Sequence, residues 1–256
     1  MKKNIFLTFI WLFTLLIISC NQTNPKSSQT NAEQNVSSDK IKTVMTKQMQ
    51  DDLTPDAVLE DLLNGNQRYI SGKMENRDLS AQVAATTDGQ FPKAVILACI
   101  DSRIPVEYIF DQGIGDVFVV RVAGNIEDPE LLGSMEYGLG VAGSKLLMVL
   151  GHENCGAVKA AIEKVDVGSE NITALLSHLE QSIQEIEGTR NSKDKAYLDK
   201  VIKKNVNQTV EDIRNRSSII SGLEKEGKVK VVGAYYSLTD GKVTLLQDDT
   251  QEVHEH

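Results

Sequence analysis

Two short apolar runs dominate the hydrophobic pattern of the chain. Residues 94–98 and 146–150 read AVILA and LLMVL, with no polar side chain in either. Uninterrupted runs of this length are typical of strands that are buried on both faces of a parallel sheet. A third run, residues 117–122, predicts another buried strand. Residues 229–238 and 242–246 predict two more strands, and the intervening TDG sequence favours a hairpin between them.

Apolar residues at helical spacing fill the intervals between these strands. One helix is expected to begin after Thr54, whose side chain can cap it, with Pro55 in its first turn, and to end near Gly72. Further helices are predicted at residues 105–111, 128–142, from about Cys155 onward, 173–187 and 194–219. This alternation predicts an α/β domain with a mainly parallel central sheet flanked by helices and a C-terminal hairpin strand.

The amino-terminal segment has the composition of a targeting sequence. Two lysines precede an apolar stretch of about 14 residues, which is short for a membrane span of about 20. Residues 1–19 are therefore predicted to be a signal peptide. It ends at an ISC sequence that resembles the lipobox of bacterial lipoproteins, so we expect Cys20 to carry the lipid. Residues 20–52 are predicted to be a flexible tether, 53–250 the folded domain and 251–256 a charged tail.

The composition excludes one class of partner. The chain has 27 Lys and Arg against 36 Asp and Glu, which gives a net charge of −9. We expect an acidic chain without a basic cluster not to bind nucleic acid. With 41% hydrophobic and 25% charged residues, the composition is otherwise that of an ordinary globular protein.

Chemically reactive side chains follow the two most apolar runs. Cys99, Asp101 and Arg103 come after the first run, and a backbone that stays extended would place all three on one side. His152 and Cys155 come after the second run. The carboxyl ends of parallel strands meet at one edge of a sheet, where open α/β sheets bind their ligands. Two thiols and an imidazole suit zinc, so we expect one Zn²⁺ per chain.

These stretches resemble the β-class carbonic anhydrases, and the resemblance runs from about Asp56 to about Leu246. The chain departs from the family at Val122, because many members have Asn at the position that follows Arg121. The matching stretches are CIDSR (99–103), FDQG (110–113), GDVFVVR (115–121), AGN (123–125), EY (136–137) and GHENCGAV (151–158).

The resemblance implies a zinc enzyme that interconverts CO2 and bicarbonate and assembles as a homodimer or a higher homo-oligomer. It implies Cys99, His152 and Cys155 as the metal ligands. Asp101 has two alternative roles. It orients the attacking water while Arg103 holds it in a two-armed ion pair, or it occupies the fourth zinc position itself and blocks water.

Two further residues are candidates for lining the site. Gln112 lies within the FDQG stretch, and Gly156 is expected to allow close backbone approach at the start of a helix. The resemblance also implies that the helix beginning at Pro55 packs on the partner subunit. From its periodicity alone, this helix closes the core of its own chain equally well.

Two other functions fit the same residues. One is a zinc hydrolase of the same fold that acts on a CO2 analogue, such as carbonyl sulfide or carbon disulfide. The other is a non-catalytic zinc-binding lipoprotein, although a closed structural site has no need of Asp101 and Arg103. Together with the amino-terminal segment, the favoured hypothesis is a lipid-anchored carbonic anhydrase of the bacterial cell envelope. It would face the periplasm, with the lipid on Cys20 as its only membrane contact.

Overall fold

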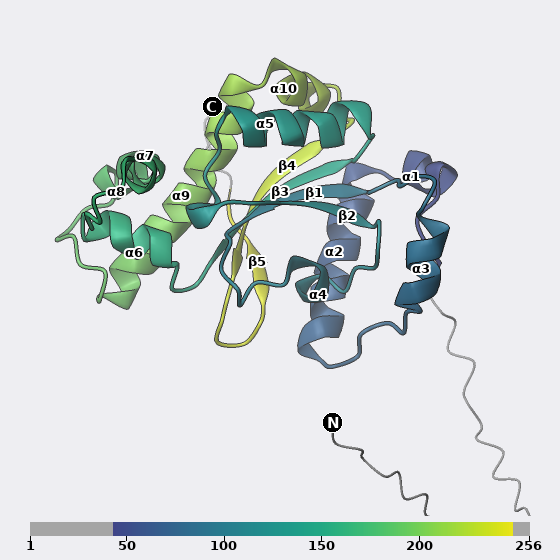
Figure 1. Cartoon of the computed structure of the whole chain (residues 1–256), viewed down its shortest axis with the longest axis horizontal. Helices are drawn as coiled ribbons and strands as arrows, with labels where there is room; N and C mark the ends of the chain where they lie inside the picture. The colour runs from purple at the N-terminus through teal and green to yellow at the C-terminus, as the bar shows by residue number, and fades with distance from the viewer. Residues whose placement is uncertain (1–42, 248–256) are drawn as a thin grey trace, which may run out of the picture. The chain divides into compact units, whose positions relative to one another are not determined.

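A five-stranded sheet organises the computed structural model, which describes residues 43–247 (Figure 1). The strand order is β2-β1-β3-β4-β5, in which the first four strands run parallel and β5 is antiparallel to β4. The predicted α/β class with a C-terminal hairpin strand is therefore confirmed. In chain order the elements are α1 (Lys47–Asp52), α2 (Pro55–Ile70), α3 (Leu79–Ala85), β1 (Ala94–Ala98), α4 (Val106–Ile109), β2 (Val117–Arg121), a 3₁₀ turn (Ala123–Asn125), α5 (Pro129–Glu136), a π-helical turn (Tyr137–Val141), β3 (Leu146–His152), α6 (Gly156–Ile162), α7 (Glu170–Ser177), α8 (Glu180–Gln184), α9 (Lys195–Arg216), α10 (Ser218–Lys225), β4 (Lys230–Tyr236) and β5 (Val243–Leu245).

Strands β1 and β3 are buried along their whole length, as their apolar sequences predict. Alternate residues of each strand point to opposite faces and enter two separate cores. Ile96 and Met148 belong to the core that includes α2 and α4, whereas Leu97 and Val149 belong to the core that includes α5, α9 and α10. Figure 1 shows the sheet between α2 and α4 on one side and α5 and α10 on the other. Helices on both faces explain why neither strand alternates with polar residues.

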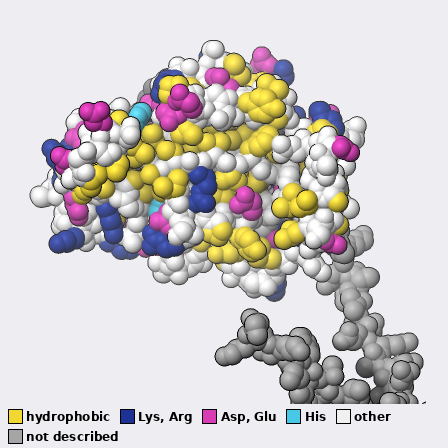
Figure 2. Space-filling model, in the orientation of Figure 1, with side chains coloured by type: hydrophobic (Ala, Val, Ile, Leu, Met, Phe, Trp, Pro, Cys, Tyr) yellow, Lys and Arg dark blue, Asp and Glu magenta, His cyan; other side chains and the backbone are white. Residues whose placement is uncertain are grey.

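Strand β2 differs from the prediction of a third fully buried strand. Four of its residues are half-buried and Arg121 is exposed. The physical reason is its position, because β2 forms one edge of the sheet and no strand among residues 43–247 lies beyond it. Figure 2 shows hydrophobic side chains gathered across the face that β2 crosses, between α5 and α4. The exposed large apolar residues of these neighbouring segments include Ile100, Tyr108 and Tyr137.

Two predicted helices are each divided in the structure. The one expected at 173–187 is α7 followed by α8, and the one expected at 194–219 is α9 followed by α10. Ser217 explains the second break, because it has a non-helical backbone and its side chain accepts the N–H of Ile220 to cap α10. Apolar periodicity continues across such a break, so the sequence pattern alone merges the two helices.

The folded domain begins before residue 53, where the prediction placed the end of the tether. Residues 47–52 form α1, and Gln50 within it is fully buried. The Gln50 amide donates to the carbonyls of Pro92 and Ala142 at 2.8 and 2.9 Å. The buried amide of Gln50 therefore attaches α1 to the folded domain, although the polar composition of this segment is typical of a flexible tether. The predicted signal peptide, Cys20 and the charged tail lie outside the described residues.

Helix α2 forms as the sequence predicts, with the Thr54 side chain accepting the N–H of Ala57 at 3.2 Å. Val58 and Leu62 are fully buried in the core of their own chain. The helix therefore closes the core of its own chain. Among residues 43–247, no helix is both long enough and apolar enough to span a bilayer.

Candidate metal centre

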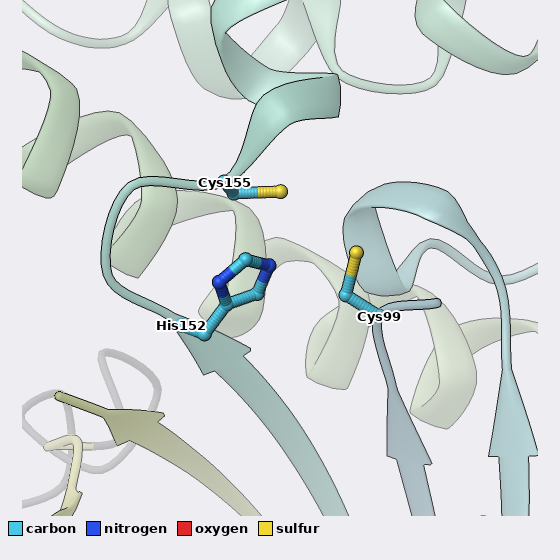
Figure 3. A group of neighbouring side chains, drawn as sticks. All are labelled: Cys99, His152 and Cys155. Carbon is cyan, nitrogen blue, oxygen red and sulfur yellow. The ribbon is translucent and has the colours of Figure 1, made fainter. Parts of the chain in front are cut away.

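Cys99, His152 and Cys155 converge at the carboxyl edge of the sheet (Figure 3). Cys99 directly follows β1, His152 is the last residue of β3, and Cys155 precedes α6. Because β1 and β3 are hydrogen-bonded neighbours, the sheet itself brings two of these residues together. One potential ligand atom from each residue lies within 4.8 Å of the other two. All three residues are buried, with exposures of 4% for Cys99, 0% for His152 and 1% for Cys155.

One nitrogen of His152 is held by the backbone and the other is free. His152 Nδ1 lies 2.9 Å from the carbonyl oxygen of Glu153. A carbonyl can only accept, so Nδ1 carries the hydrogen and Nε2 of the neutral ring keeps its lone pair. Nε2 is buried and has no hydrogen-bond partner among the described residues. Buried polar atoms normally have a partner, so this nitrogen indicates a ligand that binds beside the two sulfurs.

The two sulfurs differ in their protonation. A hydrogen bond from Cys155, with further donation from the Gly124 N–H, outweighs burial and lowers the pKa of Cys99 to about 4. The same hydrogen bond, together with burial and the charge on Cys99, raises the pKa of Cys155. A thiolate beside a protonated thiol is a pair that suits a divalent cation. The cation displaces the remaining proton and compensates the negative charge that then resides on both sulfurs.

The donor set therefore fits zinc. Two cysteine sulfurs and an imidazole nitrogen with an available lone pair are ligands typical of catalytic Zn²⁺ sites, in which three protein ligands leave one position open. The Glu153 carbonyl completes the arrangement, because metal-binding histidines donate their second N–H to an acceptor that fixes the ring.

Asp101 and Arg103 form a two-armed ion pair next to Cys99. Arg103 Nε donates to Oδ1 at 2.9 Å, and a terminal nitrogen donates to Oδ2 at 2.7 Å. These hydrogen bonds are the main cause of a pKa for Asp101 well below its usual range, so the carboxylate is ionised. It lies outside the group of three clustered ligand atoms. In the structure, Arg103 therefore engages both oxygens of the Asp101 carboxylate.

The backbone after Cys99 is not extended, which corrects the geometry expected from the sequence. Asp101 Oδ1 also accepts the N–H of Arg103 at 2.9 Å, and this local bond turns the chain. The two side chains meet because of the turn rather than because alternate residues share a face. The prediction that they lie beside Cys99 is correct for a different physical reason.

Arg121 is a site residue whose role the sequence analysis did not identify. Its Nε donates to the carbonyl of Cys99 at 2.8 Å, and a terminal nitrogen donates to the carbonyl of Asp101 at 2.6 Å. Arg121 ends β2, the strand beside β1, so its side chain reaches across to the neighbouring loop. The sequence does contain a signal for such a role, because an arginine ends an otherwise apolar strand.

Gly124 and Asn205 support the same loop from the other side. The Gly124 N–H donates to Cys99 Sγ at 3.4 Å, and the Asn205 amide donates to the Gly124 carbonyl at 2.8 Å. Gly124 has a positive φ of 77°, a conformation that favours glycine. Asn205 is a buried polar residue on the apolar face of α9, between Ile202 and Val206. That position could have marked it as a residue with a specific polar partner.

Gln112 makes a hydrogen bond within its own turn, and Gly156 begins α6 without a close neighbour. The Gln112 amide donates to the carbonyl of Phe110 at 2.6 Å, within its own turn, and the residue is buried rather than exposed on a loop. A side-chain carbon added at Gly156 would meet no atom within 4 Å. Gly156 therefore allows no close approach, because the first turn of α6 directs this position outward.

A cavity of about 560 Å³ adjoins the centre. Arg103, Glu153 and Asn154 line it on the side of the metal loops, and Lys195 and Thr239 line it on the side of α9 and the β4–β5 hairpin. The loop that joins His152 to Cys155 therefore forms one wall of this cavity.

Comparison with known proteins identifies the family. The model of the family described as carbonic anhydrase matches residues 94–243, more than half of the chain. Carbonic anhydrase 2 of Mycobacterium tuberculosis is 37% identical over 195 residues, which cover 75% of this chain and 92% of that protein. The carbonic anhydrase of Mycolicibacterium smegmatis is 36% identical over 192 residues, which cover 75% of this chain and 93% of that protein.

Solved structures with a similar fold are β-carbonic anhydrases. A tetrameric enzyme of Sordaria macrospora has a TM-score of 0.58 at 21% identity, and the match covers 74% of this chain and 96% of that one. The Coccomyxa enzyme in complex with acetazolamide has a TM-score of 0.56 at 24% identity, with coverages of 73% and 86%. Fold and site together define an α/β enzyme of the β class. The chain belongs to the carbonic anhydrase family and is a lyase of that family.

Proposed function

We propose that this carbonic anhydrase hydrates CO2 with one zinc ion held by Cys99, His152 and Cys155. The observation that carries the zinc assignment is the free, buried Nε2 of His152, which lies beside two cysteine sulfurs while Nδ1 is fixed by a carbonyl. When bound, zinc supplies Lewis acidity that lowers the pKa of water toward about 7.

The Asp101 carboxylate is the acceptor that orients the attacking water. It is ionised, and the fork of Arg103 fixes both of its oxygens, so it can accept a hydrogen bond without rotating. An acceptor in a fixed position directs a lone pair of the water oxygen toward the carbon of CO2. Asp101 does not have to take the proton, because its low pKa makes it a poor base.

Arg121 and Gly124 keep this geometry in place. Arg121 holds the carbonyls of the residues that carry the thiol and the carboxylate, so Cys99 and Asp101 keep a constant separation. The Gly124 N–H places a positive dipole at Cys99 Sγ and favours the thiolate. These contacts are made by groups of the chain itself, so that little reorganisation is needed during the reaction.

Paired assays test this proposal. CO2 hydration is followed by stopped flow, and hydrolysis of carbonyl sulfide and carbon disulfide is measured on the same zinc-quantified sample. The proposal predicts rapid CO2 hydration and about one zinc per chain. Preferential turnover of a sulfur-containing analogue would replace it with the hydrolase alternative. Bound zinc without any turnover would favour the non-catalytic alternative.

We further propose that the enzyme is a homo-oligomer that associates through the β2 edge. An edge strand presents unpaired N–H and C=O groups, and β2 is half-buried with apolar side chains. Hydrophobic side chains cover this face in Figure 2, which is typical of a surface that a second copy of the chain covers. The Sordaria enzyme of similar fold is described as tetrameric. Light scattering on the purified chain should give at least twice the mass of 28.2 kDa, less any removed leader.

For the amino terminus we propose cleavage after Ser19 and a lipid on Cys20, which would anchor the enzyme in the bacterial envelope facing the periplasm. The support is the basic start, the apolar stretch and the ISC sequence. Growth with a labelled fatty acid tests it. Label is expected in the full chain and absent from Cys20→Ala, and label retained by that variant would overturn the assignment.

A further inference from the structure

Glu153 lies between two of the proposed metal ligands. Its carbonyl holds His152 Nδ1, but its side chain has no part in the chemistry described above. Its backbone N–H donates to the carbonyl of Tyr236 at 2.8 Å, and its carbonyl accepts from His152 Nδ1 at 2.9 Å. The same peptide segment therefore ends the β3–β4 pairing and sets the orientation of the imidazole.

The side chain of Glu153 is anchored on two other elements, the turn between β4 and β5 and the start of α9. One carboxylate oxygen accepts the N–H of Thr239 at 3.0 Å and its hydroxyl at 2.9 Å, in the turn between β4 and β5. The other oxygen accepts from Lys195, the first residue of α9.

We propose that Glu153 is a positioning residue for the metal centre. Its anchored carboxylate fixes the carbonyl that holds His152 Nδ1, and thereby keeps Nε2 directed at the two sulfurs. This inference rests on the proposed zinc site. It adds that Thr239 and Lys195, which lie outside the loops that carry the ligands, help to orient His152 through Glu153.

Two observations distinguish this contact from an ordinary surface ion pair. The Glu153 side chain is only 12% exposed, whereas that of Lys195 is 68% exposed. Exposed pairs contribute little on their own. Here the carboxylate also accepts two hydrogen bonds from Thr239, one of them from the backbone, and it belongs to the two-residue link between His152 and Cys155. The next residue, Asn154, has a positive φ of 63°, so the link already has a constrained conformation.

The expected consequence is a change in zinc affinity. Without the anchor, the Glu153 carbonyl can turn and His152 Nδ1 loses its fixed acceptor. Removing residues that orient metal-binding histidines costs about 10- to 100-fold in metal affinity. Glu153→Ala should therefore raise the zinc Kd by about that factor. Glu153→Gln should raise it less, because an amide oxygen can still accept the N–H of Thr239.

The experiment is a competition for zinc between the full-length protein and a chromophoric chelator. Wild type, Glu153→Ala and Glu153→Gln are compared with Glu180→Gln. Glu180 is a matched control, because it pairs with Arg190 on the surface and its loss removes the same charge. The control should keep the wild-type zinc Kd. The melting temperature of each metal-free protein is recorded as well, because a merely structural role would lower it and leave the zinc Kd unchanged.

Two milder variants keep the test decisive if Glu153→Ala does not fold. Thr239→Val removes the hydroxyl donor and keeps the backbone N–H. Lys195→Ala removes the ion pair with Glu153, together with the 3.2 Å ion pair that Lys195 forms with Asp199. Each should raise the zinc Kd by a smaller factor than the loss of the carboxylate. Wild-type zinc affinity in every folded variant would overturn the inference while leaving the proposed function intact. A wild-type protein that binds no zinc would overturn both.

Discussion

Two buried polar clusters of this molecule have contrasting hydrogen bonding. At the metal centre, His152 Nε2 has no partner among the described residues. In the second cluster, which we call the Asp111 cluster, Asp111 is fully buried between Arg68, Arg77 and Glu75. It accepts from Arg68 Nε at 2.5 Å, from the Glu75 N–H at 3.1 Å, and from the Arg77 guanidinium. Asp111 and His152 are both fully buried, but only Asp111 has a hydrogen-bond partner for each of its side-chain polar atoms.

This difference separates a binding site from a structural one. Burial alone would raise the pKa of Asp111, but the hydrogen bonds from Arg68, Glu75 and Arg77 outweigh it and lower that pKa. Both oxygens of the Asp111 carboxylate accept hydrogen bonds from other residues of the chain. The cluster therefore joins the segment after α2 to the turn after α4 without any ligand. In the imidazole of His152, by contrast, Nδ1 has a hydrogen-bond partner and Nε2 has none among the described residues. What marks the metal centre as a binding site is that its free nitrogen lies beside two cysteine sulfurs, a set of atoms that a metal ion can bind.

The largest effect is expected when one ligand of the metal centre is removed. Cys155→Ser replaces a thiolate by a hydroxyl that does not ionise near pH 7, so most of the zinc and nearly all CO2 hydration should be lost. Metal analysis and stopped flow measure the two. Asp111→Asn is the control from the contrasting cluster and should retain its zinc. Full zinc occupancy and activity in Cys155→Ser would contradict the assignment of this ligand.

Removing zinc in the presence of an oxidant should also abolish activity, but reversibly. Cys99 and Cys155 are free cysteines with their sulfurs within 4.8 Å of one another. Hydrogen peroxide would take two electrons and two protons from the pair and form one disulfide and two waters. After chelation and peroxide, thiol titration should fall by two per chain, and zinc should restore activity only after a reductant is added. Recovery with zinc alone would show that metal binding does not protect these thiols.

Separating Asp101 from Arg103 should lower activity and leave the metal in place. In Arg103→Ala the carboxylate loses both arms of its partner and is free to rotate toward the open metal position. A positioned acceptor of this kind contributes about 10²-fold or more to a rate, so kcat/KM should fall by about that factor with zinc retained. Adding Asp101→Ala should not restore the rate, because the acceptor is then missing. A near-normal rate for Arg103→Ala would remove the proposed role.

The smallest effect on activity is expected from the Asp111 cluster. Asp111→Asn leaves Arg68 and Arg77 without a buried counter-charge and should lower the free energy of unfolding by about 3 kcal/mol near pH 7. Because the folded-state pKa of Asp111 is depressed, its contribution is present above the unfolded pKa of about 3.9 and is lost as the pH falls through the folded value.

Urea unfolding of the metal-free proteins checks this pH dependence. The difference between wild type and Asp111→Asn should be constant from pH 7 to about pH 5 and should shrink below about pH 4. CO2 hydration by the zinc-loaded variant at 25 °C should match that of wild type. A large loss of activity at unchanged zinc content would show that the two clusters are coupled.

The sequence predicts the fold and the convergence of the metal centre because both depend on short-range patterns. Apolar runs define β1 and β3, and the parallel sheet then brings Cys99 beside His152. Polar contacts made at long range leave no such pattern. Gln50 looks like part of a tether until its partners at Pro92 and Ala142 are known.

The residues that hold the metal centre in place could not be predicted from the sequence, because their contacts are also made at long range. Arg121 and Asn205 act through backbone carbonyls on elements far away in the sequence. Glu153 depends on Thr239, 86 residues further along the chain. Spacing along the sequence identifies candidate ligands, and only the three-dimensional arrangement identifies what holds them.

The most direct test of the central claim is a zinc titration of the metal-free enzyme, with CO2 hydration measured by stopped flow at each addition under reducing conditions. The account predicts a negligible rate without metal, a linear rise with added zinc, and a plateau at one equivalent per chain. Full activity in the protein that is shown to be free of metal would contradict it, as would a protein that binds one zinc and remains inactive toward CO2.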